Sequence, residues 1–172
     1  MTETVPERAA RAFEGHEAFE RDGRWFDVTT TTFEGRVTAR ETGEWEIEYT
    51  LEVRAPTLSA ATEDDVGDAV EAGWFETYER RLEDAGMAVR QDVEFDDYRL
   101  IEEAGEAVAV FEFEWGNADH APDMAKAMTE YAEGTYMEGI VPGYEYTPPV
   151  SELLSRARSD AGSDGASGPM PL

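Results

Sequence analysis

Residues Trp45 to Arg54 read Trp-Glu-Ile-Glu-Tyr-Thr-Leu-Glu-Val-Arg, and this stretch decides the fold. Apolar side chains occupy every second position and alternate with charged or polar ones. Because successive side chains of a β-strand point to opposite faces, the pattern predicts a strand with one buried and one wet face. We therefore expect a sheet that is covered on one side.

The segment before this strand forms the other arm of a predicted hairpin. The register that we predict sets five pairs opposite one another: Ala39 and Trp45, Val37 and Ile47, Phe33 and Leu51, Arg36 and Glu48, Arg40 and Glu44. Every apolar residue then meets another, and both arginines meet a glutamate. The connecting loop is Glu41-Thr42-Gly43, with glycine where a left-handed conformation is needed.

Periodicity and turn residues divide the rest of the chain. They predict a helix from Pro6 to Gly15, a hairpin turning at Asp22-Gly23, a bend within 29–32, a long helix within 62–86, a hairpin turning at Ala104-Gly105 and a helix from Pro122 to Gly134. The order α-β-β-β-α-β-β-α indicates an α+β fold, an antiparallel meander of about five strands covered by about three helices. Residues 1–158 make a single domain, and 159–172 a disordered tail rich in Gly, Ser and Pro.

The charge of the chain points to its surroundings. The 172 residues include 40 acidic and 14 basic ones, and the net charge is −26. Small domains ordinarily carry a net charge of magnitude ~2–8. The mutual repulsion opposes folding in dilute buffer, but at about 1 M salt the Debye length falls to ~3 Å and screens most of it. This composition is typical of a protein adapted to a salt-loaded cytoplasm.

Several classes of protein conflict with this composition. The chain has no cysteine, which excludes disulfides, thiolate metal sites and thiol nucleophiles. Its N-terminus lacks the basic and apolar regions of a signal peptide, and no apolar run reaches the ~18 residues of a membrane span. Nucleic acid requires a positive footprint, which thirteen scattered arginines and Lys126 do not supply. We expect a cytoplasmic protein without nucleic-acid or membrane partners.

Two resemblances add to this interpretation. The arginine-rich acidic composition, the Gly73-Trp74-Phe75 helix and the strand from Phe111 to Trp115 look like an uncharacterised protein family of halophilic archaea. That resemblance implies no activity, cofactor or catalytic residue. The element order from Val5 to Gly134 resembles the fold of type III secretion chaperones and related small bacterial helper proteins, although no sequence motif accompanies it.

One cluster has the residue types of a metal site. His120 is one of two histidines, and Asp119 and Asp123 lie beside it near the start of the third helix. An imidazole and two carboxylates could hold a divalent ion and leave positions open for water. The alternative is that Asp119 caps the helix and His120 is a solvated loop residue. His16 has no motif around it, and a distant pairing with His120 remains open.

An aromatic segment follows the last predicted helix. Its apolar residues follow no single period and must pack on the flank of the domain or on a partner: Tyr136, Met137, Ile140, Val141, Tyr144 and Tyr146. We predict that Tyr136, Met137, Ile140, Tyr144 and Tyr146 form a partner-binding surface. Elsewhere, no carboxylate pair, serine or glycine-rich loop has the context of a catalytic motif.

These observations favour a non-enzymatic binding or chaperone-like helper, without a cofactor, that binds a protein partner or forms a homodimer through a sheet edge or a helix. The alternative is a metal-dependent hydrolase that uses His120, Asp119 and Asp123. A third hypothesis, an acidic decoy for a nucleic-acid-binding protein, requires charge concentrated in one stripe, whereas the forty acids are widely scattered.

Overall fold

The computed structural model describes residues 4–43 and 46–167, and within them one antiparallel sheet organises the chain. Its six strands lie in the order β1-β2-β3-β4-β6-β5. The strands are β1 Phe19–Asp22, β2 Trp25–Val28, β3 Glu34–Glu41, β4 Ile47–Pro56, β5 Asp97–Glu103 and β6 Glu106–Trp115. The predicted α+β class is confirmed. One strand more than expected is present because the bend predicted within 29–32 separates β2 from β3.

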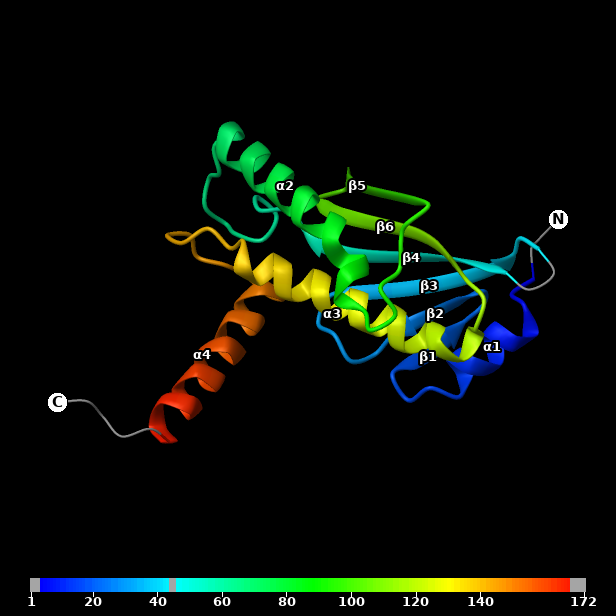
Figure 1. Cartoon of the computed structure of the whole chain (residues 1–172). Helices are drawn as coiled ribbons and strands as arrows, with labels where there is room; N and C mark the ends of the chain where they lie inside the picture. Colours follow the sequence, from blue (N-terminus) through cyan, green and yellow to red (C-terminus); the bar gives the residue numbers. More distant parts are fainter. Residues whose placement is uncertain (1–3, 44–45, 168–172) are drawn as a thin grey trace.

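Helices cover one face of this sheet. They are α1 Glu7–Glu14, α2 Asp68–Leu82, α3 Ala121–Glu138 and α4 Val150–Ser167, with short 3-10 helices η1 Glu83–Ala88 and η2 Ala118–His120. α1, α2 and α3 lie over the same side of the strands, and α4 projects away from the body (Figure 1). Within the described residues, no helix combines the length and apolar character that crossing a membrane requires.

Alternation along the strands creates the core. In β4, every residue from Ile47 to Ala55 at odd positions is buried and its neighbours are partly exposed, as the sequence pattern predicts. The buried rings pack closely: Phe13 of α1 lies 5.0 Å from Phe26 and 6.1 Å from Tyr49, and Tyr49 stacks on Phe113 at 5.5 Å between centroids. Aromatic contacts of this kind join α1 to three strands.

The predicted β3–β4 hairpin is present, but its predicted register is wrong. Val37 pairs with Leu51, Ala39 with Tyr49, and Glu41 with Ile47. The faces are nevertheless as expected, because the register differs from the prediction by an even number of residues. The connection is longer than Glu41-Thr42-Gly43, and the Thr42 amide donates to the Glu46 carbonyl at 3.2 Å. Glu44 and Trp45 lie outside the described residues.

The charged pairs of this hairpin change partners with the register. Arg36 lies opposite Glu52 and Arg40 opposite Glu48, in place of the predicted partners Glu48 and Glu44. Each arginine makes an ion pair at 2.7 Å with its observed partner. The apolar alternation fits either register equally well, so that pattern alone could not distinguish them.

Two helix boundaries differ from the sequence prediction, and a fourth helix is present. α2 begins at Asp68, because Thr62 is held instead in a β-bridge with Tyr146. α3 continues through Gly134 as far as Glu138, since a single glycine within a helix is tolerated. α4 extends to Ser167, past the predicted domain boundary at residue 158, so the predicted disordered tail 159–172 is helical as far as Ser167. Residues 168–172 lie outside the described part.

α3 approaches the sheet closely at Gly35. A Cβ atom built on Gly35 would lie 2.6 Å from Cγ2 of Thr129 and 3.1 Å from its Oγ1. Thr129 is fully buried, and its hydroxyl donates to the Ala125 carbonyl at 2.7 Å. A side chain at position 35 would therefore force α3 away from β3.

We predict that Gly35→Ala lowers the free energy of unfolding by about 1–3 kcal/mol, the usual range for an overpacked core. Urea unfolding at constant salt measures the change. Gly73→Ala is the matched control, because no heavy atom lies within 4 Å of a Cβ there. Gly73 lies inside α2, so alanine should stabilise by up to about 1 kcal/mol. If Gly35→Ala and Gly73→Ala changed the free energy of unfolding equally, this would contradict the close approach of α3 to β3 at Gly35.

Candidate functional site

The face of the sheet opposite the helices is polar and carries two hollows. Its side chains come from the alternate strand positions that the core does not use, including Arg36, Arg40, Glu52 and Arg54. We call this surface the open face. It is the candidate site, because none of the helices in the described part of the chain covers the sheet there (Figure 1).

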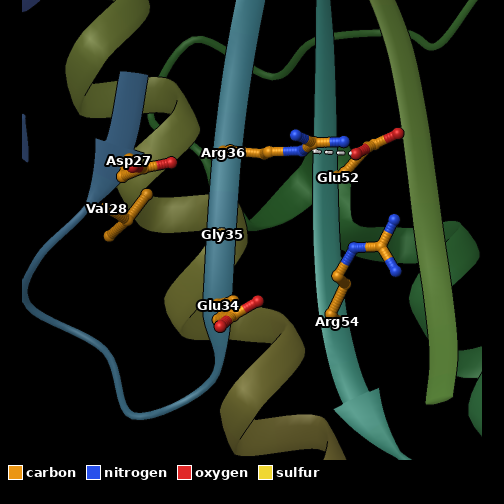
Figure 2. Close-up of a pocket in the computed structure, with 7 residues that line it drawn as sticks. All are labelled: Asp27, Val28, Glu34, Gly35, Arg36, Glu52 and Arg54. Atoms are coloured by element: carbon orange, nitrogen blue, oxygen red, sulfur yellow. Dashed lines mark hydrogen bonds and ion pairs between the residues drawn. The ribbon is translucent and has the colours of Figure 1, made fainter. Parts of the chain in front are cut away.

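The larger hollow of the open face has a volume of about 440 Å³. Its lining residues are Asp27, Val28, Glu34, Gly35, Arg36, Glu52 and Arg54. β2 ends at Val28 and leaves the sheet through the 29–33 loop, whereas β3 begins only at Glu34. Figure 2 shows the resulting gap between the end of β2 and the Gly35 segment of β3. We call it the Gly35 hollow.

Acidic and basic side chains alternate across the strands that line the Gly35 hollow. Asp27 of β2 lies opposite Arg36 of β3, which lies opposite Glu52 of β4, and Glu34 of β3 lies opposite Arg54 of β4 (Figure 2). Neither Asp27 nor Glu34 takes part in an ion pair with another of the described residues. This arrangement suits a ligand that carries a cationic and an anionic group a few ångströms apart.

The two arginines are held to different degrees. Nε of Arg36 donates to Oε2 of Glu52 at 2.7 Å, and its guanidinium lies 4.0 Å from the centre of the Trp25 ring. Arg54 is paired more loosely, with its Nη1 3.5 Å from Glu103 and 3.4 Å from Glu106. Arg36 is therefore held in one position beside the hollow, whereas Arg54 can give up its long ion pairs and bind a ligand instead.

A second hollow of about 210 Å³ lies further along the same strands, lined by Arg24, Thr38, Ala39, Arg40, Glu48, Thr50 and Glu112. Near it, Glu48, Asp96 and Glu114 are the one group of three or more acidic or histidine side chains, within the described residues, whose ligand atoms all lie within 4.8 Å of one another. These carboxylates have the chemistry to hold a divalent cation. Partial desolvation, followed by the charges of Glu114 and Glu48, raises the pKa of Asp96 above its usual value.

Asp96→Asn should raise the melting temperature at neutral pH, because it removes a negative charge from the Glu48–Asp96–Glu114 cluster. Folding raises the pKa of this carboxyl, so its ionised form destabilises the folded protein when the pH is above that raised pKa. The destabilisation is lost when the pH falls below the ordinary value of 3.8, where the carboxyl is protonated in the folded and the unfolded protein alike. The gain should therefore shrink as the pH falls towards 3.8. Melting curves at several pH values measure it, with Asp84→Asn on η1 as the control. A gain that is independent of pH would contradict this origin.

The three residues of the predicted metal site have hydrogen-bond partners outside this set. Asp123 accepts a hydrogen bond from Nε2 of His16 at 2.8 Å, and the other ring nitrogen of His16 accepts the Ala18 amide at 3.1 Å. Nδ1 of His120 accepts from the Trp115 indole at 3.5 Å. The backbone amide of Asp119 donates to the Asn117 side chain at 3.1 Å. Sequence reasoning did not anticipate the partnership of His16 with Asp123, because 107 positions separate them.

His120 and Asp123 nevertheless share a hollow. It has a volume of about 700 Å³ and lies between α3 and the segment after η1, lined by Ala88, Val89, Arg90, Gln91, His120, Asp123 and Ala127. Asp119 is absent from this lining. The hollow therefore brings together two of the three predicted ligands, without a third acidic or histidine side chain in its lining.

The predicted partner-binding segment is folded onto the body of the protein. Tyr136 belongs to α3, is 1% exposed, and donates from its hydroxyl to the Pro56 carbonyl at 2.9 Å, so it is a core residue. Burial raises its pKa, and that of Tyr78, well above the usual tyrosine range. The other predicted residues are partly buried and pack against the core: Met137, Ile140, Tyr144 and Tyr146.

The loop beside the Gly35 hollow is fixed by α3. Oε2 of Glu133 accepts the backbone amides of Thr32 at 2.8 Å and Phe33 at 2.9 Å. The Phe33 ring packs edge-on to Tyr136 at 4.8 Å. One carboxylate thus holds the chain where β2 and β3 part, and so maintains the shape of the hollow.

Glu133→Ala should destabilise the protein by about 1–3 kcal/mol, because two backbone amides lose a charged acceptor. Glu130→Ala, which removes an exposed pair with Lys126, should cost less than about 1 kcal/mol. Chemical unfolding gives both values. Amide hydrogen exchange should accelerate at Thr32 and Phe33 in the Glu133 variant only. Unchanged exchange there would show that another group holds the loop.

The fold and the open face define the chain as a mixed α+β protein with a one-sided antiparallel sheet. Residues 14–156 match a family of unknown function (DUF5813), and the chain belongs to that family. No curated protein and no solved structure matches this chain. The predicted membership of an uncharacterised family is thus confirmed, whereas a halophilic archaeal origin and a likeness to secretion chaperones stay predictions.

Proposed function

We propose that this chain is a cytoplasmic, non-enzymatic binding protein, a chaperone-like helper that holds a segment of a protein partner against its open face. The Gly35 hollow carries the proposal: a gap of about 440 Å³ in the open face, lined by three acidic side chains and two arginines that alternate across the strands. The segment that fits it presents a basic side chain to Asp27 and Glu34 and an acidic one to Arg54.

The energetics of the hollow support a binding role. Asp27 and Glu34 make no ion pair within the described residues, so a basic group can approach them without breaking an existing contact. The net charge of −26 draws a basic segment towards the protein and repels a purely anionic one. Opposed charges within the hollow then fix the orientation of the segment.

The test is a pull-down from native cell extract at the salt concentration of those cells, with the tagged wild type and two double variants. Asp27→Lys/Glu34→Lys reverses the charge of the two acidic residues of the hollow that make no ion pair, and should abolish recovery of a stoichiometric protein. Glu76→Lys/Asp84→Lys changes the net charge equally, on exposed positions of α2 and η1, and should leave recovery unchanged. Circular dichroism of each variant confirms that it is folded.

A third variant separates the two candidate surfaces. Tyr144→Ala removes a ring from the aromatic segment, which is the alternative contact predicted from the sequence. Loss of the partner with Tyr144→Ala, but not with Asp27→Lys/Glu34→Lys, would contradict binding at the open face. The absence of any stoichiometric partner from the wild type would contradict the helper role itself.

A further inference from the structure

We propose that the chain forms a homodimer in which the edge strand β5 pairs with β5 of a second copy, and so continues the sheet across two molecules. β5 is the last strand of the sheet order and, among the described residues, pairs only with β6. It spans Asp97–Glu103, long enough for a further strand to pair along it. A strand edge of this kind is a template for another strand.

The side chains of β5 are complementary to their own copy in one antiparallel register. With Ile101 opposite Ile101 of the second copy, Arg99 lies opposite Glu103, and the two-fold axis generates the same pair again. All three residues lie on the open face, because they pair with Val110, Val108 and Glu106 of β6, which belong to the set of strand positions outside the core. The dimer would therefore join an apolar centre to two flanking ion pairs.

Ile101 supplies the apolar centre of this contact. It is 41% exposed and is one of three large apolar side chains exposed in the described part of the chain. Val108, directly beside it on β6, is 1% exposed, although it lies outside the core cluster. Pairing two copies would cover both Ile101 side chains and extend the apolar strip formed with Val108.

The backbone of β5 is compatible with this register. Ala104 and Gly105 have φ of 51° and 80°, as in a two-residue type I′ turn, which makes Glu103 and Glu106 the hydrogen-bonded pair next to the turn. Hydrogen-bonded pairs alternate along an antiparallel ladder, so the free edge presents the backbone groups of Leu100 and Glu102. In the proposed register these two residues face one another across the dimer and can exchange hydrogen bonds.

The net charge sets the conditions under which the dimer forms. Two copies of a chain with net charge −26 repel each other strongly in dilute buffer. Salt at about 1 M shortens the Debye length to ~3 Å and so screens the repulsion between charges that lie far apart. The charges of the Arg99–Glu103 contacts lie closer together than most of the repelling charges, so salt screens their attraction less. The dimer should therefore be stronger in concentrated KCl than in dilute buffer. Its two Gly35 hollows would then lie on the same side of one continuous sheet.

Sedimentation equilibrium in about 2 M KCl tests the register through charge exchange, under conditions where long-range repulsion is screened. Arg99→Glu alone and Glu103→Arg alone each place like charges opposite one another and should weaken the dimer roughly tenfold or more. The double variant Arg99→Glu/Glu103→Arg restores opposite charges across the axis, and should return the affinity to within about threefold of the wild type. Monomeric wild type at high concentration would overturn the proposal.

A cysteine cross-link tests the centre of the contact independently. The chain has no cysteine of its own, so a single substitution gives an unambiguous disulfide. The Cα atoms of a non-hydrogen-bonded pair lie about 4.5 Å apart, within the range that a disulfide spans, so Ile101→Cys should cross-link under mild oxidation. Val70→Cys on α2 is the control, because Val70 is 40% exposed against 41% for Ile101. Equal cross-linking of both variants, or none with Ile101→Cys, would overturn the register.

Discussion

The close packing of α3 on β3 at Gly35 is the constraint on which the rest of the structure depends. A Cβ there would lie 2.6 Å from Thr129, so glycine lets the helix lie against the strand. From the same helix, Glu133 holds the loop in which β2 leaves the sheet. The hollow opens on the other face, where β2 ends at Val28 before β3 begins at Glu34. α3 thus packs on the buried face of the sheet and, through Glu133, also fixes the loop that borders the opposite face.

Much of the fold follows from periodicity. The alternation within residues 45–54 correctly predicts a strand with one buried face, and the turn at Ala104-Gly105 is confirmed by its two positive φ angles. The register of β3 on β4 was not predictable from that alternation, because a shift by an even number of residues preserves both faces. Helix ends were missed where a distant contact decides them, as at Thr62, which bridges Tyr146.

The candidate site was harder to predict than the fold. Strand parity places Arg36, Arg40 and Arg54 on one wet face, and this signal was available in the sequence. The hollow itself depends on where β2 leaves β3 and on the approach of α3, which no local pattern reports. The predicted cluster of His120, Asp119 and Asp123 was drawn from neighbours in sequence, whereas Asp123 pairs with His16 from the other end of the domain. In a chain with 40 acidic residues, such local clusters carry little information.

Labelling of carboxylates would show whether a partner covers the open face. The complex recovered from native extract and the isolated chain would be treated with a carbodiimide and an amine, and modification would be read at each acidic residue by mass spectrometry. The account predicts that Asp27 and Glu34 lose modification in the complex, while Glu76 and Asp84 on the helical side keep theirs. Protection of Glu76 and Asp84, with Asp27 and Glu34 still labelled, would contradict it.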